Sequence, residues 1–122
     1  MKKCITILFI ICHLFSSCDL LDTNIIKKTI KYEIIGNATD VDIWYFNSTG
    51  GSERHRNIAL PWELTFSVEF DKYTLFLAFI EANGRNGNIT VNVFVNGKIF
   101  KTSTSSGSSP SARAEGYLVR EK

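Results

Sequence analysis

Histidine, cysteine and paired carboxylates are the side chains of this sequence that could carry catalysis or hold a metal. After Cys18 there is no further cysteine, and the one histidine, His55, stands between two arginines. A zinc or copper site, or a nucleophile with its base, needs more partners than this. We therefore interpret His55 as a surface side chain and expect neither a metal nor a cofactor.

Two carboxylates on one strand could also act as an acid–base pair. Glu63 and Glu69 share a polar face, but six residues of strand separate them by about 20 Å, beyond the roughly 5–10 Å that glycoside hydrolysis needs. Asp40 and Asp42 lie about 7 Å apart by the same alternation. They stand at a strand start, where solvated acids are common. The sequence therefore predicts a protein that is not an enzyme.

Cys18 is the residue with the clearest chemical role. Two lysines, an apolar run from Cys4 to Leu14 and the small residues Ser16 and Ser17 precede it, which is the pattern of a secretory leader. A cysteine at this point resembles the lipobox of bacterial lipoproteins, whose thiol carries a diacylglycerol. The apolar run is too short to cross a membrane as a helix. An ordinary cleaved leader and an uncleaved anchor remain the alternatives.

Removal of residues 1–17 would change the bulk properties of the chain. The formal charge would fall from +2 to zero, because Lys2 and Lys3 leave and every acidic residue stays. A neutral domain has no bulk attraction for nucleic acid. With Cys18 lipidated, no disulfide is available. We expect a lipidated N-terminus and tether over residues 18–28 and one domain over residues 29–122.

Period-two alternation runs through most of that domain. Apolar residues alternate with polar ones near Ile30–Ile34, Val41–Tyr45, Trp62–Phe70 and Ile89–Val95, which predicts half-buried strands. The segment 73–82 is apolar on both faces. Its composition favours a central strand over a helix. Asn96-Gly97 predicts a type I′ hairpin that pairs Val95 with Lys98, Phe94 with Ile99 and Val93 with Phe100.

The remaining segments complete the predicted fold. The Ser/Thr/Gly/Pro stretch over residues 103–111 predicts a loop, and residues 112–119 offer a last strand. Seven or eight short strands with regular turns indicate an antiparallel β-sandwich or a small barrel, and we favour the sandwich. Three glycosylation-type sequons begin at Asn37, Asn47 and Asn88. Beside a bacterial lipobox, we interpret them as turn and strand residues.

Aromatic side chains are the remaining candidates for binding. Alternation places Trp44 and Phe46 opposite the inward Ile43 and Tyr45, on a face that a two-sheet sandwich leaves in solvent. Either other residues cover them, or they form a contact surface. The candidate binding residues are Trp44, Phe46, Trp62, Phe94 and Ile99.

Several of these segments together resemble the mycobacterial membrane protein small (MmpS-type) family. The resemblance rests on Tyr32-Glu-Ile-Ile-Gly36, Asp42-Ile-Trp-Tyr45, Leu60-Pro-Trp62 and Val95-Asn-Gly-Lys-Ile-Phe-Lys101, in order over residues 29–119. It implies an immunoglobulin-like β-sandwich held outside the membrane, beside transporters that export lipids or siderophores. It implies no catalytic residues. The family is anchored by a spanning helix, where this sequence has Cys18.

The sequence thus predicts a lipid-anchored protein of the bacterial cell envelope, with the outer membrane as the favoured site. Its expected partner is an envelope protein or a transporter. The alternative is a glycan or a lipid as ligand.

Overall fold

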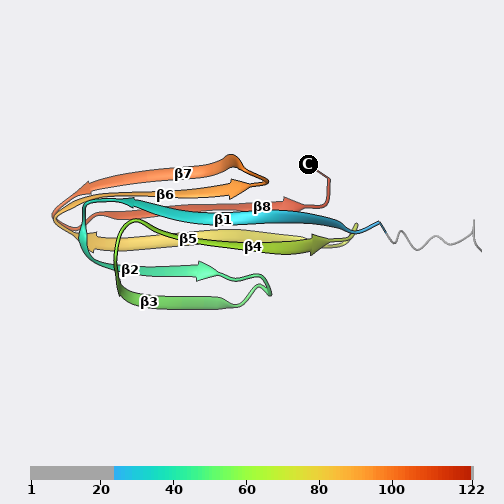
Figure 1. Ribbon diagram of the computed structural model, residues 1–122, viewed down its shortest axis with the longest axis horizontal. Coiled ribbons are helices and arrows are strands. Elements are labelled where there is room, and N and C mark those ends of the chain that lie inside the picture. The colour runs from blue at the N-terminus through green and yellow to red at the C-terminus, as the bar shows by residue number, and fades with distance from the viewer. Residues whose placement is uncertain (1–23, 122) are drawn as a thin grey trace, which may run out of the picture.

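The computed structural model describes residues 24–121, and all regular structure in that range is β-strand (Figure 1). The predicted leader 1–17 and Cys18 lie outside the described residues. In chain order the strands are β1 (Ile26–Gly36), β2 (Thr39–Phe46), β3 (Ser52–Ile58), β4 (Trp62–Phe70), β5 (Leu75–Arg85), β6 (Gly87–Val95), β7 (Lys98–Gly107) and β8 (Ser111–Val119).

The strands form two four-stranded sheets that face each other. One sheet has the order β4-β1-β6-β7 and the other β3-β2-β5-β8, and every pairing is antiparallel. The prediction of an all-β antiparallel sandwich with seven or eight strands is therefore confirmed. So is the central position of the 73–82 segment, because β5 lies between β2 and β8.

Alternation along each strand builds the core between the sheets. Ile30, Tyr32 and Ile34 of β1 point inward and are fully buried, as are the inward residues of β6. Ile43 and Tyr45 of β2 meet them from the other sheet. Each inward side chain contributes roughly 1.5–3 kcal/mol of burial, so the domain is held by its apolar core.

The hairpin between β6 and β7 has the predicted turn but a different register. Asn96 and Gly97 both have positive φ (52° and 83°), and Val95 pairs with Lys98 and Phe94 with Ile99. A β-bulge follows, so Val93 lies opposite Lys101. The predicted pairing of Val93 with Phe100 is therefore wrong. The extra residue turns Phe100 toward the core, where it packs as a half-buried side chain.

Three strand boundaries also differ from the sequence reading. β1 begins at Ile26, so Lys27 and Lys28 belong to the first strand, although the sequence assigned them to the tether. β7 continues to Gly107 through residues expected to be a loop, because β6 pairs with it along that length. β5 reaches Arg85, which confines the turn before β6 to Asn86. His55 lies on β3, at the edge of its sheet.

The asparagines of the three sequons bond to the backbone of turns. Asn37 and Asn88 bond reciprocally: the Asn88 amide N–H donates to Asn37 Oδ1 at 2.8 Å, and the Asn37 amide N–H donates to Asn88 Oδ1 at 3.1 Å. Asn47 Oδ1 accepts from the backbone N–H groups of Thr49 and Gly51. These contacts agree with their interpretation as turn and strand residues.

Candidate functional site

Three aromatic rings pack together on the outer side of the β3-β2-β5-β8 sheet. Trp44 and Phe46 come from β2 and Phe79 from β5, and we call this cluster the aromatic face. The Phe79 ring centroid lies 4.9 Å from those of both Trp44 and Phe46. The Trp44 and Phe46 centroids are 6.2 Å apart. Alternation explains the placement, because the neighbouring Ile43, Tyr45 and Ile80 occupy the inward positions.

Two arginines cover these rings from outside. The guanidinium of Arg54 on β3 lies 4.6 Å from the Trp44 ring centroid, and that of Arg113 on β8 lies 5.8 Å from the Phe79 centroid. Phe79 is only 6% exposed, while Trp44 and Phe46 are half-buried. Neighbours thus cover these outward aromatics in part, and the Trp44 and Phe46 rings still reach the surface.

The indole nitrogen of Trp44 has an unusual environment. Its Nε1–H is buried and has no hydrogen-bond partner within residues 24–121. Buried donors are nearly always paired, because an unpaired one costs about 1–3 kcal/mol. An unpaired donor at the edge of the indole marks this part of the face as one where an acceptor would be stabilising.

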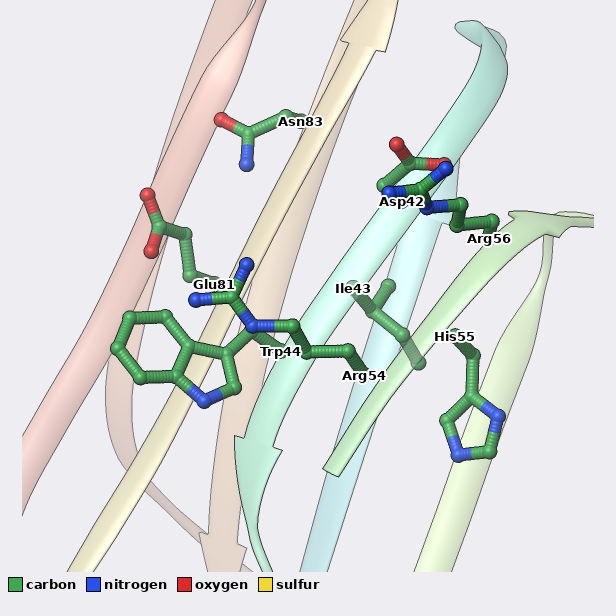
Figure 2. A pocket seen from close by; sticks show the side chains of 8 residues that line it. All are labelled: Asp42, Ile43, Trp44, Arg54, His55, Arg56, Glu81 and Asn83. Carbon is green, nitrogen blue, oxygen red and sulfur yellow. The ribbon is translucent and has the colours of Figure 1, made fainter. Parts of the chain in front are cut away.

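A cleft of about 330 Å³ opens beside the aromatic face, toward the start of β2 (Figure 2). Figure 2 shows the Arg54 guanidinium over the indole and the Glu81 carboxylate near the ring. Asp42 and Arg56 lie together at the other side, and the His55 ring points away from Trp44. The lining residues are Asp42, Ile43, Trp44, Arg54, His55, Arg56, Glu81 and Asn83. Acidic and basic side chains therefore line the same cleft as the Trp44 ring.

His55 belongs to a separate cluster on the inward side of β3. Its ring stacks on Tyr45 at a centroid distance of 5.7 Å, and its Nε2 lies 3.2 Å from the Tyr45 hydroxyl. That hydroxyl donates to Glu53 Oε1 at 3.1 Å, and Asn47 Nδ2 donates to Glu53 Oε2 at 2.9 Å. The four side chains thus form one hydrogen-bonded group at the sheet edge.

The electrostatics of this group favour a structural role. The hydrogen bond from Asn47, followed by that from Tyr45, lowers the pKa of the Glu53 carboxyl. Burial, helped by the nearby Glu53, raises the pKa of Tyr45 to about 12. A phenol that acts as a nucleophile or base needs a lowered pKa, so Tyr45 is shifted the wrong way. Residues 24–121 contain no group of three metal-ligating side chains.

The five candidate binding residues fall in three different places. Trp44 and Phe46 lie together, as described. Phe94 and Ile99 are neighbours on the outer face of the other sheet, where Lys31 Nζ lies 5.1 Å from the Phe94 ring centroid. Trp62 points inward instead, where it is half-buried and packs on Tyr45 with a centroid distance of 5.6 Å, apart from the other four.

Sequence reasoning missed Phe79 as a member of the site. The signal was present, because the 73–82 segment is apolar on both faces and therefore had to place a large side chain on the outside. That the ring would lie under Phe46 and Trp44 depends on the pairing of β2 with β5, which the sequence alone does not specify.

Fold and surface together describe a small all-β domain with an aromatic outer face and without a recognisable catalytic centre among residues 24–121. No helix in that range is long and apolar enough to span a membrane.

The family model described as Mycobacterium membrane protein matches residues 16–114 of the chain. The chain belongs to this family, as the sequence resemblance predicted. No curated protein matches it.

Membership makes this a membrane-associated protein of the cell envelope. The family is described as a membrane protein and not as an enzyme. The match begins at Ser16, so it includes Cys18 and the segment that leads into β1.

Proposed function

We propose that this protein is a non-enzymatic envelope lipoprotein, anchored through Cys18, whose β-sandwich binds a protein partner through the aromatic face. A transport system of the envelope is the class of partner that fits its family. The observation that carries the proposal is the half-buried ring of Trp44, with its unpaired Nε1–H, beneath the Arg54 guanidinium.

The chemistry of this face suits protein recognition. Tryptophan and arginine are enriched among the residues that dominate binding energy, and such residues cluster in partly desolvated patches. Trp44 and Phe46 are held rigidly against Phe79, so little side-chain entropy remains to be lost on binding. A partner carbonyl or carboxylate placed at the edge of the indole could accept the buried N–H of Trp44.

The anchor rests on the sequence. Cys18 follows the small residues of the leader, and five residues separate it from Asn24, the first described residue. A diacylglycerol chain pair gives durable membrane attachment, since each buried methylene contributes about 0.8 kcal/mol. The outer membrane is the proposed location.

A capture experiment with matched variants tests the partner-binding role. The tagged full chain is cross-linked in cells and recovered from membranes as wild type, Trp44→Ala and Phe94→Ala. Phe94 is the matched control, because it is also an outer-face aromatic ring covered by a cation. We expect an envelope protein that wild type and Phe94→Ala recover and Trp44→Ala does not. Equal recovery by all three chains, or none by any, would refute the proposal.

The cleft beside Trp44 favours glycan or lipid binding as a second candidate function. It sets one aromatic ring among Asp42, Glu81, Asn83 and two arginines, and sugars are bound by such combinations of apolar and polar groups. The test is tryptophan fluorescence in a Trp62→Phe chain, in which Trp44 is the only indole of the domain. A change in emission with one member of a glycan or lipid panel would support binding. A flat response across the panel would count against it.

A further inference from the structure

Most of the exposed large apolar side chains gather at one end of the sandwich. Of the eight in the described residues, Ile35 and Ile99 lie elsewhere. The other six form what we call the tether end: Ile25, Ile26, Tyr73, Leu75, Tyr117 and Val119.

These six residues come to one end of the sandwich from both sheets. Ile26 pairs with Phe70 at the end of β4, and Leu75 at the start of β5 pairs with Val119 near the end of β8. Tyr73 lies in the turn between β4 and β5. Figure 1 shows the start of β1, the end of β4 and the end of β8 at the same end of the molecule.

Hydrogen bonds join the segments at this end. Lys28 Nζ donates to the Val119 carbonyl at 2.6 Å, and Arg120 donates to the Asn24 carbonyl at 3.0 Å. In the β4–β5 turn, Asp71 Oδ1 accepts from the Tyr73 N–H at 2.8 Å. The exposed apolar side chains are therefore presented on a fixed framework, as a binding surface requires.

The first described residue, Asn24, lies at this same end, so residues 1–23 join the domain here. Residues 1–23 precede Asn24, and the apolar run Cys4–Leu14 lies among them. From Cys18 to Asn24 the chain reaches at most about 20 Å when fully extended. An anchor at Cys18 therefore keeps the tether end close to the bilayer, so contact costs little further entropy.

The side chains at this end are those found at membrane–water interfaces. Tyr73 is 81% exposed and Tyr117 65%, and tyrosine is enriched where an apolar ring meets lipid and its hydroxyl meets water. The ammonium of Lys72 lies 5.1 Å from the Tyr73 ring centroid, where it can reach headgroups. Lys27 and Lys72 are balanced by Glu69 and Asp71 nearby, so the apolar groups, rather than net charge, would drive contact.

We propose that the tether end docks directly on the lipid interface, so that the domain rests on the bilayer with this end down. The proposal depends on the membrane anchor of the proposed function and adds an orientation to it. The 11 residues of β1 span about 35 Å. The cleft, which lies beside the first half of β2, is nearer the opposite end and would be held away from the membrane.

Lipid quenching in vesicles tests this orientation. The lipidated full chain, purified from bacterial membranes, is reconstituted in phosphatidylcholine vesicles with or without brominated acyl chains. Tyr117→Trp places a reporter indole at the tether end, and Ile35→Trp places one at the other end of β1; emission of the parent chain is subtracted from both. We expect bromolipid to quench the indole at position 117 and not the one at position 35. Addition of phosphatidylglycerol should leave the difference unchanged.

Further measurements separate the outcomes. Flotation shows whether the chain stays with the vesicles. Equal quenching at positions 117 and 35 in a chain that floats would overturn docking and leave the anchor intact. A chain that does not float would overturn both proposals. Cross-linking of two copies through position 117 without lipid quenching would assign this end to a second copy instead. Tyr73→Ser with Leu75→Ser, both exposed positions, should reduce quenching at position 117 without changing the thermal transition.

Discussion

The hydroxyl of Tyr32 donates a hydrogen bond to the backbone carbonyl of Phe46 at 2.7 Å, across the space between the two sheets. The same oxygen accepts from the Phe79 N–H at 3.2 Å. Tyr32 is fully buried, and burial raises the pKa of its hydroxyl. One side chain of β1 thus holds the backbone of two of the three residues of the aromatic face.

Loss of this hydroxyl should destabilise the domain. Tyr32→Phe leaves the Phe46 carbonyl and the Phe79 N–H without this partner, which costs about 1–3 kcal/mol for a buried polar group. Urea unfolding followed by tryptophan fluorescence measures the change. Tyr73→Phe is the control, because the Tyr73 ring is exposed, and it should stay within about 0.5 kcal/mol of wild type. An unchanged midpoint for Tyr32→Phe would contradict the prediction.

Stability should fall in alkali, in part because of Tyr45. Its pKa is about 12 in the folded protein and about 10 in an unfolded chain. Between these values the unfolded state loses the proton first, so this contribution is fully present below pH 10 and is lost as the pH rises toward 12.

Tyr45→Phe should therefore flatten the alkaline loss. Urea midpoints measured from neutral pH upward should decline less steeply than in wild type. Some decline should remain, because Tyr32 is shifted in the same direction. Identical slopes in the two proteins would show that Tyr45 does not contribute.

Gly36 should tolerate no side chain. Its φ is +136°, and an added Cβ would overlap the backbone carbonyl of Asn88. That carbonyl also accepts the N–H groups of Asn37 and Ala38, so it cannot move away freely. We expect Gly36→Ala to cost more than about 2 kcal/mol.

Gly50 provides the matched control for Gly36→Ala. It also has positive φ, but no atom lies within 4 Å of an added Cβ. Gly50→Ala should therefore cost only the backbone strain, about 1–2 kcal/mol. Thermal unfolding of both variants compares strain alone with strain plus overlap. Equal losses would mean that the contact at Asn88 relaxes.

Cys18 should determine membrane attachment. In Cys18→Ser the thiol that would carry the lipid is absent, so the chain should move from the membrane fraction to the soluble fraction or remain uncleaved. Cys12→Ser changes a leader cysteine and should behave as wild type. Mass spectrometry of the mature N-terminus should find a lipid-modified Cys18. A mature chain that begins elsewhere without lipid would support the ordinary secretory leader.

Much of the fold follows from alternation in the sequence. Where one face is apolar and the other polar, as at Ile30, Tyr32 and Ile34, the buried side was predicted correctly. The outward position of Trp44 and Phe46 followed from the same rule. These positions are predictable because a one-residue shift would expose every core side chain of the strand.

Other features depend on pairing that a single strand does not reveal. A bulge moved Phe100 out of register with Val93, and no residue type marks that position. Trp62 was named as a candidate binding residue, but it packs on Tyr45 from the facing sheet. Residues 103–107 read as a loop, because serine and threonine resemble turn residues until a neighbouring strand pairs with them. The cleft combines β2, β3 and β5, so its shape also follows from tertiary pairing.

The position of β1 has a mechanical consequence. This strand leads out to residues 1–23 and lies between two partners, pairing with β4 from Ile26 to Ile34 and with β6 from Ile30 to Gly36. Its hydrogen bonds run across the strand direction, so a pull along the strand toward the membrane loads many of them together rather than one after another. Force transmitted between a bilayer and a bound partner would therefore act in shear on the β1–β4 and β1–β6 hydrogen bonds. The domain should stay folded under such a load.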